Sequence, residues 1–505
     1  MPGSGGSNAV SDYDYIVVGG GTAGCVLAAR LSEDASVRVL LLEAGSAECT
    51  RAMTVPDAWP EVLGTAADWA DLTTGQADAG PIPYPRGRAL GGSGAINAMA
   101  HVRGHRAVYD GWAAGGSAGW GFADLLPYFR RSERAVGDPA LRGTSGPVRV
   151  APVPEGDRHP VAGAFAEALV GIGCPATDDL SGQRQEGVAW ADLAIAGGQR
   201  VSPADAYLRR ALHRPNLVVQ ARCLVTRLHV HNGRCVAVSY LRDGAAARAH
   251  TTGEVILCAG AVGSPRLLML SGIGPAGPMR ALGISPVADI AGVGGNLQDH
   301  PIAMVSYGSA SALPRSGYNH GEVYAALSSP LAGACPNLHL FPILLPVAPA
   351  GYQPPAAGFA LVAAAVAPDS TGSVRLATAD PRAVPLIDPG FLRDRRDLDR
   401  LEAGLAIIRQ AAAGAAFPRA AEVWPGAGAR TRAWIRRTVG SYYHPVGTCR
   451  MGNDPDAVVD TELRIRGIAG LRIADASVIP VIPNAPLHAT VLAIAEKAAD
   501  LVGGR

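Results

Sequence analysis

Apolar residues recur along this chain in two different periods, and the change of period predicts its first elements. Residues 13–21, YDYIVVGGG, form an apolar run that ends in glycines, as in a buried strand that leads into a turn. Residues 22–33 then carry small apolar side chains at helical spacing. Residues 36–45, SVRVLLLEAG, follow as a second buried strand. The order strand, helix, strand predicts a βαβ unit and therefore a parallel sheet.

The middle of the chain follows a strand and turn pattern. Residues 216–244 contain Asn-Gly at 232–233 and Asp-Gly at 243–244, pairs that favour tight hairpin turns. We therefore predict a β-meander in this stretch. Residues 254–274 predict a buried strand, a glycine turn and a short helix.

The pattern changes again between about residues 306 and 440. Residues 336–347 and 358–368 are apolar runs of strand length, and residues 398–414 have the spacing of an amphipathic helix. We interpret this region as part of a second domain. Residues 490–502 predict a final helix.

Composition supports a large protein with more than one domain. The chain has 505 residues, of which 48% are hydrophobic, enough to bury extensive cores. Its 44 basic and 43 acidic residues leave a formal charge of +1. Such a balance supplies no long-range field for nucleic acid or for an anionic membrane, so neither is predicted as a partner.

The cysteines and the first residues bear on the compartment. None of the eight cysteines forms a C-x-x-C pair, and several lie in apolar runs, so we expect reduced thiols and no metal site. Residues 1–12, MPGSGGSNAVSD, lack the basic and apolar regions of a signal peptide and are expected to be a flexible leader. No apolar run reaches the length of a membrane span. We predict a cytoplasmic protein.

A glycine motif lies where the first strand turns into the first helix. Gly19 permits a tight turn, Gly21 lets the backbone approach a pyrophosphate, and Gly24 lets the helix pack against the strand. Glu43 ends the second strand, where a carboxylate can accept hydrogen bonds from a ribose diol. Together these features predict a dinucleotide site, but the motif does not separate FAD from NAD.

A second glycine-rich loop carries a family resemblance. Residues 88–97, RALGGSGAIN, resemble the first signature of the glucose-methanol-choline (GMC) oxidoreductases, a family of FAD enzymes. Residues 260–274, GAVGSPRLLMLSGIG, resemble the second signature. GVGGNLQDHP at 292–301 and YYHPVGTCRMG at 442–452 extend the similarity, in family order, across residues 12 to 503. Within the family the chain is similar to bacterial hydroxymethylfurfural and aryl-alcohol oxidases and to choline dehydrogenase-like proteins.

The resemblance implies an α/β fold, α+β overall, with two domains. A Rossmann-like FAD-binding domain is expected from residues 12–155, 200–305 and 440–505. A substrate domain, built on an antiparallel sheet backed by helices, is expected from residues 156–199 and 306–439.

The resemblance also implies FAD contacts at the matching positions. They are Gly19, Gly21, Thr22, Gly24, Glu43, Ala44, Arg88, Gly91, Ser93, Asn97, Ala98, Met99, Val225, Ala259, Asp475 and Ala476. Some relatives attach the flavin covalently through a histidine just before the asparagine of the first signature. That position is Ile96 here, which has no nucleophile, so we predict non-covalent FAD.

Two histidines near the C-terminus are the expected catalytic pair. His444 matches the proposed base of the family, and His488 matches the position of its partner, often an asparagine, when counted back from the AEK sequence at 495–497. Neutral imidazole is a suitable base near neutral pH, and a second ring can orient the alcohol for hydride transfer. Which of the two is the base stays open. Pro486 replaces a family asparagine in the turn before His488, and its effect also stays open.

The expected substrate is a neutral alcohol. Tyr443, His101, His339 and Phe341 are candidates for the pocket wall, and no cluster of acids and aromatics indicates a cage for a quaternary ammonium group. We predict an oxidase that acts on an aromatic, furanic or natural-product alcohol with O2 as acceptor. The alternatives are a choline-type dehydrogenase linked to a quinone or carrier, an FAD-containing hydroxynitrile lyase, an NAD-linked dehydrogenase and a binding protein without activity.

Overall fold

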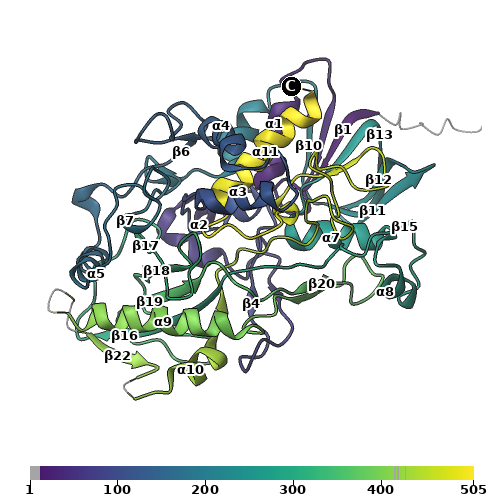
Figure 1. Cartoon of the computed structure of the whole chain (residues 1–505). Helices are drawn as coiled ribbons and strands as arrows, with labels where there is room; N and C mark the ends of the chain where they lie inside the picture. The colour runs from purple at the N-terminus through teal and green to yellow at the C-terminus, as the bar shows by residue number, and fades with distance from the viewer. Residues whose placement is uncertain (1–11, 415–416, 418–419, 427, 505) are drawn as a thin grey trace, which may run out of the picture.

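The fold is built around two large sheets, seen in a computed structural model that describes residues 12–414, 417, 420–426 and 428–504 (Figure 1). The predicted leader, apart from Asp12, lies outside these residues. The first sheet has the order β10-β2-β1-β13-β12-β11, with β24 also paired to β13. Its parallel strands are β1 (Tyr13–Val18), β2 (Val39–Leu42), β10 (Leu217–Gln220), β13 (Ala245–Leu257) and β24 (Leu471–Ile473).

The predicted βαβ unit and meander are confirmed. Helix α1 (Thr22–Leu31) connects β1 to β2, and these two strands pair in parallel. Strands β11 (Cys223–His231), β12 (Arg234–Arg242) and β13 form an antiparallel meander. Asn232 and Asp243 have positive φ values of 48° each, as a tight hairpin turn requires.

The second sheet is antiparallel and has the order β22-β16-β19-β18-β17-β7, with β23 paired to β16. Its strands are β7 (Gly187–Trp190), β16 (Pro301–Ser309), β17 (Val323–Leu327), β18 (Leu338–Ile343), β19 (Gly358–Ala365), β22 (Ala420–Trp424) and β23 (Gly440–Ser441). The predicted amphipathic helix is α9 (Arg395–Ala412), which begins at the Asp394 cap and buries Leu401, Leu405 and Ile408 against the sheet.

Helices complete the layers around both sheets. In Figure 1, α9 runs below the second sheet with α10 (Thr431–Thr438) beside it, and α5 (Pro160–Gly171) lies at the end of the same sheet. Helix α11 (His488–Gly503) packs between α1 and α4 (Phe122–Ser132), next to the first sheet. Helix α7 (Gly260–Leu270) follows β13 directly, as the sequence predicted.

Shorter elements connect these layers. They are α2 (Arg51–Thr54), η1 (Pro56–Val62), β3 (Asp71–Leu72), β4 (Pro83–Tyr84), η2 (Gly92–Ala95), α3 (Arg106–Ala114), β5 (Glu133–Arg134), β6 (Val148–Arg149), η3 (Glu155–Asp157), β8 (Ile195–Ala196), β9 (Gln199–Arg200), η4 (Ala204–Leu208), α6 (Arg209–Ala211), β14 (Ile273–Gly274), α8 (Ala276–Ala281), β15 (Ala288–Asp289), β20 (Ser373–Arg375), β21 (Leu386–Asp388) and η5 (Ala476–Val478).

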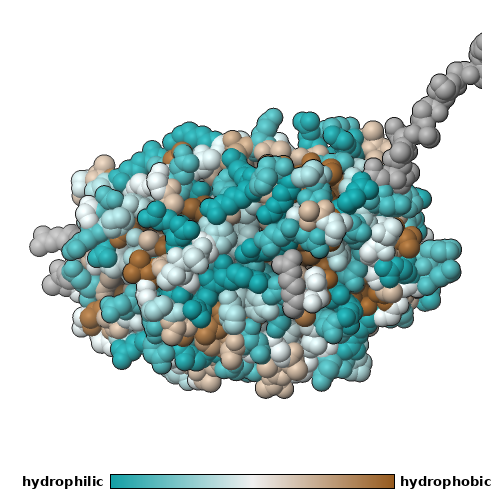
Figure 2. Space-filling model, turned by 90° about the horizontal axis from the view of Figure 1, so that it is seen from above, coloured by the Kyte–Doolittle hydropathy of each residue, from teal (hydrophilic) through white to brown (hydrophobic). Residues whose placement is uncertain are grey.

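The visible surface of the described residues has no single hydrophobic patch (Figure 2), and the cysteines are not paired in disulfide bonds. Seen from above, hydrophobic residues are scattered among hydrophilic ones (Figure 2). All eight cysteines are free thiols, five of them buried, and Cys49 is exposed. Within the described part of the chain, no helix is long and apolar enough to cross a membrane, and no group of three or more His, Cys, Asp or Glu side chains is arranged to hold a metal ion.

Candidate active site

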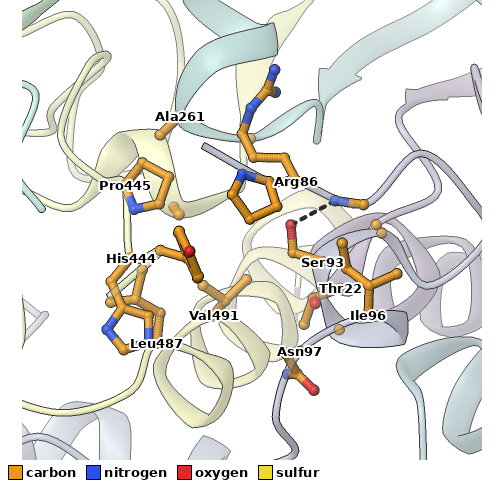
Figure 3. A pocket seen from close by; sticks show the side chains of 18 of the residues that line it. Thr22, Arg86, Ser93, Ile96, Asn97, Ala261, His444, Pro445, Leu487 and Val491 are labelled. Atoms are coloured by element: carbon orange, nitrogen blue, oxygen red, sulfur yellow. Dashed lines mark hydrogen bonds between the residues drawn. The ribbon is translucent and has the colours of Figure 1, made fainter. Parts of the chain in front are cut away.

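A cavity of about 470 Å³ lies where segments far apart in the sequence meet. Its wall takes residues from the ends of β1 and β2, from α1 and α7, from the start of α11, and from β16, β17 and β18 of the second sheet. Figure 3 shows His444 and Pro445 on one side of the cavity, and Thr22, Ser93 and Ile96 on the other. The cavity therefore joins both sheets.

One part of this wall is formed by two glycine-rich turns, residues 19–24 and 91–94, whose backbones touch because no side chain lies between them. A Cβ atom on Gly92, which has a φ of +54°, would lie 2.6 Å from the Cα atom of Gly21. A Cβ atom on Gly24 would lie 1.9 Å from the Gly19 carbonyl oxygen, so only glycine lets α1 pack this close to the turn. The first-turn amides of α1 receive no side-chain cap from Gly21. This arrangement leaves backbone N–H groups available to an anionic group.

Glu43 closes the same part of the cavity at the end of β2. Its Oε2 atom accepts a hydrogen bond from the Gly20 backbone N–H at 2.7 Å, and its Oε1 atom accepts one from the Gly45 N–H at 2.7 Å. Burial raises the pKa of this carboxyl to about 7. Each carboxylate oxygen keeps a second lone pair, so Glu43 can still accept from a ribose hydroxyl.

Asp475 combines two functions at the end of β24. Its Oδ1 atom accepts from the Ser477 backbone N–H at 2.8 Å and so caps η5. Its Oδ2 atom accepts from the Gly260 N–H at 2.8 Å and from the Ser264 hydroxyl at 2.6 Å. The residue thus ties the start of α7 to β24 while it lines the cavity.

His444 lies opposite, in the turn after β23, and is partly buried. Its Nδ1 atom lies 3.0 Å from Nδ1 of His300, so these two rings share one hydrogen bond. The two rings are perpendicular, with centroids 5.2 Å apart. Burial lowers the pKa of His444 to about 3, with His339 adding a smaller contribution in the same direction. The imidazole is therefore neutral at physiological pH, as a proton acceptor must be.

Asp299 holds both histidine backbones in place. Its Oδ1 atom accepts from the N–H groups of His300 at 2.7 Å and of His444 at 2.8 Å. Its Oδ2 atom accepts from the Ser441 hydroxyl at 2.5 Å. Burial raises the pKa of Asp299 to about 6, and these donors oppose the rise. The turn also contains Tyr443 at a φ of +65°, an unfavourable conformation that these bonds help to maintain.

His488 is the first residue of α11, and 8% of it is exposed. Neither of its ring nitrogens has a hydrogen-bond partner among the described residues. Burial lowers its pKa to about 3, and His101 and Arg200 contribute to that shift. A buried ring that lines a cavity with both nitrogens unpaired is available to a bound molecule.

Stacked aromatic rings form the wall next to His444. Tyr324 stacks on Phe341 at 5.4 Å, Phe341 stacks on Tyr442 at 4.8 Å, and Tyr442 lies 4.3 Å from the His444 ring. Ile302 and Met304 of β16 also line the cavity. Among the described lining residues, the only carboxylates belong to Glu43 and Asp475, and both are bonded to the glycine-rich segments. The histidine end is therefore apolar and aromatic.

The cavity fits a flavin dinucleotide at one end and an alcohol at the other. The side-chain-free glycine wall, the free amides of α1 and the carboxylate of Glu43 suit a pyrophosphate and a ribose. Comparison with known proteins gives the same result. Models of the GMC oxidoreductase family match residues 13–302 and 368–495. The chain belongs to the GMC oxidoreductase family. It is an FAD-dependent oxidoreductase that acts on the CH–OH group of alcohols.

Several relatives of this GMC oxidoreductase match nearly its whole length. Mitochondrial choline dehydrogenase of Homo sapiens is 36% identical and aligns over 99% of this chain and 91% of its own length. Oxygen-dependent choline dehydrogenase of Photobacterium profundum is 36% identical over 97% of this chain and 93% of its own. The crystal structure of pyridoxine 4-oxidase from Mesorbium loti superposes with a TM-score of 0.94 at 34% identity, covering 98% of this chain and 100% of that one. Formate oxidase of Aspergillus oryzae RIB40 follows at 0.90 and 26%, covering 99% of both chains.

Most of the positions expected to contact FAD or substrate in this GMC oxidoreductase line the cavity. They are Gly19, Gly21, Thr22, Glu43, Ala44, Ser93, Asn97, Ala98, Met99, Val225, Ala259, Asp475 and Ala476, together with Phe341, Tyr443, His444 and His488. Gly24, Arg88, Gly91, His101 and His339 do not line it.

These five positions lie outside the cavity wall for different reasons, and Arg88 is exposed. Gly24 contacts Gly19, and Gly91 adopts a φ of +94° to start the loop. The Arg88 guanidinium lies over the Trp69 ring at 5.1 Å. His101 packs edge to face behind His488 at 5.7 Å, and His339 packs behind Tyr324 at 6.1 Å. The resemblance implies a place in the pocket wall for His339, but the structure leaves this residue out of the cavity lining.

Three groups near His444 were not predicted from the sequence: Asp299, His300 and Ser441. The segment 292–301 was used only as part of the resemblance, although it ends in adjacent acidic and histidine residues. That pair was the available signal. Arg200, which lies behind Asn97, carried no such signal.

Proposed function

We propose that this GMC oxidoreductase oxidises a neutral aromatic alcohol and that O2 reoxidises its flavin. The observation that supports the substrate class is the aromatic wall of Tyr324, Phe341 and Tyr442 beside His444, with no carboxylate among the described lining residues at that end. A neutral ring gains contact area there, whereas a cation lacks an ion-pair partner. The likeness to pyridoxine 4-oxidase and formate oxidase supports oxygen as acceptor.

We assign the base to His444. Burial lowers the pKa of His300 well below its ordinary value, so this ring is neutral, and the Pro483 and Val366 carbonyls oppose the shift only in part. If the one ring proton of His300 is on Nε2, its Nδ1 atom accepts the hydrogen bond from Nδ1–H of His444. The lone pair of His444 is then on Nε2. That atom takes the hydroxyl proton of the alcohol, and FAD, when bound, would supply the acceptor for the hydride that leaves the carbon bearing the hydroxyl.

His488 has the orienting role in this proposal. Both of its nitrogens are free to hold the hydroxyl oxygen, so only one orientation of the C–H bond is productive. The aromatic wall excludes water and places the ring of the alcohol. Asp299 fixes the backbones of His300 and His444 and so preserves their shared hydrogen bond.

A choline-type dehydrogenase is the second candidate. The choline dehydrogenases among the relatives favour it, and aromatic rings can also bind a quaternary ammonium group through cation–π contacts. The two candidates differ in the charge of the substrate and in the electron acceptor, so one experiment separates them.

We also propose a cytoplasmic location, which the pattern of reduced thiols supports.

The test is an alcohol panel on the purified holoenzyme, with benzyl alcohol, hydroxymethylfurfural, pyridoxine and choline. We expect peroxide release in air, and a kcat/KM for the best aromatic alcohol at least about tenfold above that for choline, because a buried unpaired charge is costly. Choline as the best substrate would contradict the proposed class. Turnover only with an artificial acceptor would contradict the oxidase assignment. A flavin that no alcohol bleaches without oxygen would favour a lyase.

A further inference from the structure

Arg200 is a buried cation without an acidic partner. It lies in β9, and 5% of it is exposed. Its Nε atom donates to the Met53 carbonyl at 2.7 Å, and its Nη1 atom donates to both the carbonyl and the Oδ1 atom of Asn97, each at 2.6 Å. Its Nη2 atom has no partner, and no ion pair within the described segments includes this residue.

Burying a cation without an acidic partner costs free energy, so the presence of Arg200 in the interior calls for an explanation. Burial lowers the pKa of Arg200 only to about 10, and the side chain stays positive at neutral pH. Cys49 and Asp205 both act on Arg200 in the direction that favours its charge, but burial raises the pKa of the Cys49 thiol and keeps it uncharged at neutral pH. Asp205 is already paired with the exposed Arg209 at 3.0 Å and accepts from the Ser202 hydroxyl at 2.6 Å. Hydrogen bonds to neutral oxygens do not offset the free-energy cost of removing a cation from water. The field of Arg200 is therefore not cancelled locally.

The group that Arg200 holds forms part of the cavity wall. Asn97 Oδ1 also accepts from the Met99 backbone N–H at 2.9 Å, and Met99 has the unfavourable φ of +57°. Asn97, Ala98 and Met99 all line the cavity, with Asn97 at its lower edge in Figure 3. No described residue accepts a hydrogen bond from Asn97 Nδ2. The arginine thus occupies both oxygens of Asn97 and leaves its amide donors for the cavity.

We propose that Arg200 is a positioning residue with two effects on the cofactor site: its guanidinium holds the Asn97–Met99 turn, and its uncancelled charge favours the reduced flavin. The proposal rests on the proposed flavin contacts of that turn. Oxidation breaks the alcohol O–H bond, whose proton goes to His444, and the C–H bond, whose hydrogen leaves with both bonding electrons as a hydride for the flavin and leaves a carbonyl group on the substrate. One negative charge is thereby moved to the cofactor, where a fixed positive charge stabilises it.

The test measures FAD binding and flavin midpoint potential in three variants. Arg200→Met removes both effects: we expect FAD affinity to fall about tenfold and the preference for reduced over oxidised flavin to fall about tenfold, equal to about 30 mV for a two-electron couple. Arg200→Lys keeps the charge but cannot hold two oxygens with a planar fork, so we expect weaker FAD binding at an unchanged potential. Arg209→Met removes the neighbouring paired, exposed charge and is expected to change neither quantity.

Each result decides the proposal. Wild-type affinity and potential in Arg200→Met, or an equal loss in Arg209→Met, overturns it. If Arg200→Met does not fold, Arg200→Lys decides: a tenfold loss of the preference for reduced flavin overturns the charge effect, and unchanged FAD affinity overturns the positioning effect. Neither assay reads alcohol turnover. A wild-type protein that binds FAD but oxidises no alcohol contradicts the proposed function and leaves these comparisons valid.

Discussion

At the scale of single residues, the site depends on how one imidazole is held. His444 receives its position from the Asp299 carboxylate, which accepts from its backbone N–H, and its ring shares one hydrogen bond with His300. Burial removes the competing charged form of the ring. A base that is neutral, oriented and directed into an aromatic cavity needs no large movement before it accepts a proton.

Replacement of His444 by alanine tests this role directly. We expect His444→Ala to lower kcat by roughly 10²- to 10⁴-fold, the usual scale for loss of a general base, while flavin absorbance is retained. The exposed His213 offers a matched control, and His213→Ala should leave kcat unchanged. Near-normal turnover of His444→Ala with flavin bound would contradict the assignment.

A second pair of variants tests the hydrogen bond from His444 to His300. In His300→Leu the acceptor for Nδ1–H of His444 is lost, and we expect kcat to fall roughly 10- to 100-fold, the scale for losing a partner that fixes a ring tautomer. In His300→Asn the side-chain oxygen can still accept, so the loss should be smaller. Equal losses in both variants would show that packing, rather than the acceptor, is what His300 supplies.

The pH dependence follows from the lowered pKa of the base. A histidine pKa of about 3 means that the imidazole stays neutral as the pH falls through 6.5, the ordinary value. We therefore expect kcat/KM to stay constant as the pH falls to 6.5 and to decline only below that value. A limb near pH 6 that disappears in Asp299→Asn belongs to Asp299, whose pKa burial raises to about 6. A limb at or above pH 6.5 would contradict the neutral, buried base.

At the scale of elements, α11 is fixed by one buried carboxylate. Glu496 is fully buried and pairs with Arg30 of α1 at 2.8 Å and with Arg131 of α4 at 2.8 Å. It also accepts from the Tyr207 hydroxyl at 2.8 Å. These bonds join α1, α4 and η4 to the helix that begins with His488.

Loss of that carboxylate should destabilise the whole arrangement. For Glu496→Ala we expect the free energy of unfolding to fall by about 3 kcal/mol, because the change removes a fully buried ion-pair partner from Arg30 and Arg131 and leaves the buried Tyr207 hydroxyl without its acceptor. Glu33→Ala, which removes an exposed ion pair of the same Arg30, should cost less than about 0.5 kcal/mol. Thermal unfolding midpoints measured side by side test the difference, and equal midpoints would refute the role of Glu496.

The same scale shows what the sequence could predict. The βαβ unit, the meander and α9 were predictable because their signals are local: periodicity, glycine spacing and Asn-Gly or Asp-Gly turns. The contacts of His444 with Asp299 and His300 were not, because they close a loop of more than 140 residues. Arg200 was missed because an arginine in a polar segment carries no sign of burial. The resemblance implied that Phe341 and His339 both line the pocket; Phe341 does, whereas His339 does not, because a sequence pattern does not show how a side chain packs in depth.

At the scale of the whole molecule, the cofactor site is shared by both sheets. Residues of β1, β2 and α7 and residues of β16, β17 and β18 line one cavity. A molecule bound there contacts both halves of the protein. We therefore expect bound FAD to stabilise the folded protein as a whole.

Removal of FAD should show this contribution. Because Ile96 has no nucleophile, we expect acid precipitation to release all flavin into the supernatant and leave a colourless pellet. The apoprotein should unfold at a lower temperature than the holoenzyme, with a gain of about 2.7 kcal/mol when FAD is restored at a hundred times its Kd. A yellow washed pellet, or a single midpoint with and without FAD, would contradict these expectations.

The position of α11 in the chain has a consequence for biosynthesis. Strand β24 joins the parallel sheet beside β13, and α11 contributes His488 and closes the cavity, although both are translated after every other element of the wall. A nascent chain that has completed the second sheet still lacks one edge of the first. Residues 471–503 must therefore emerge from the ribosome before the wall of the cavity is complete.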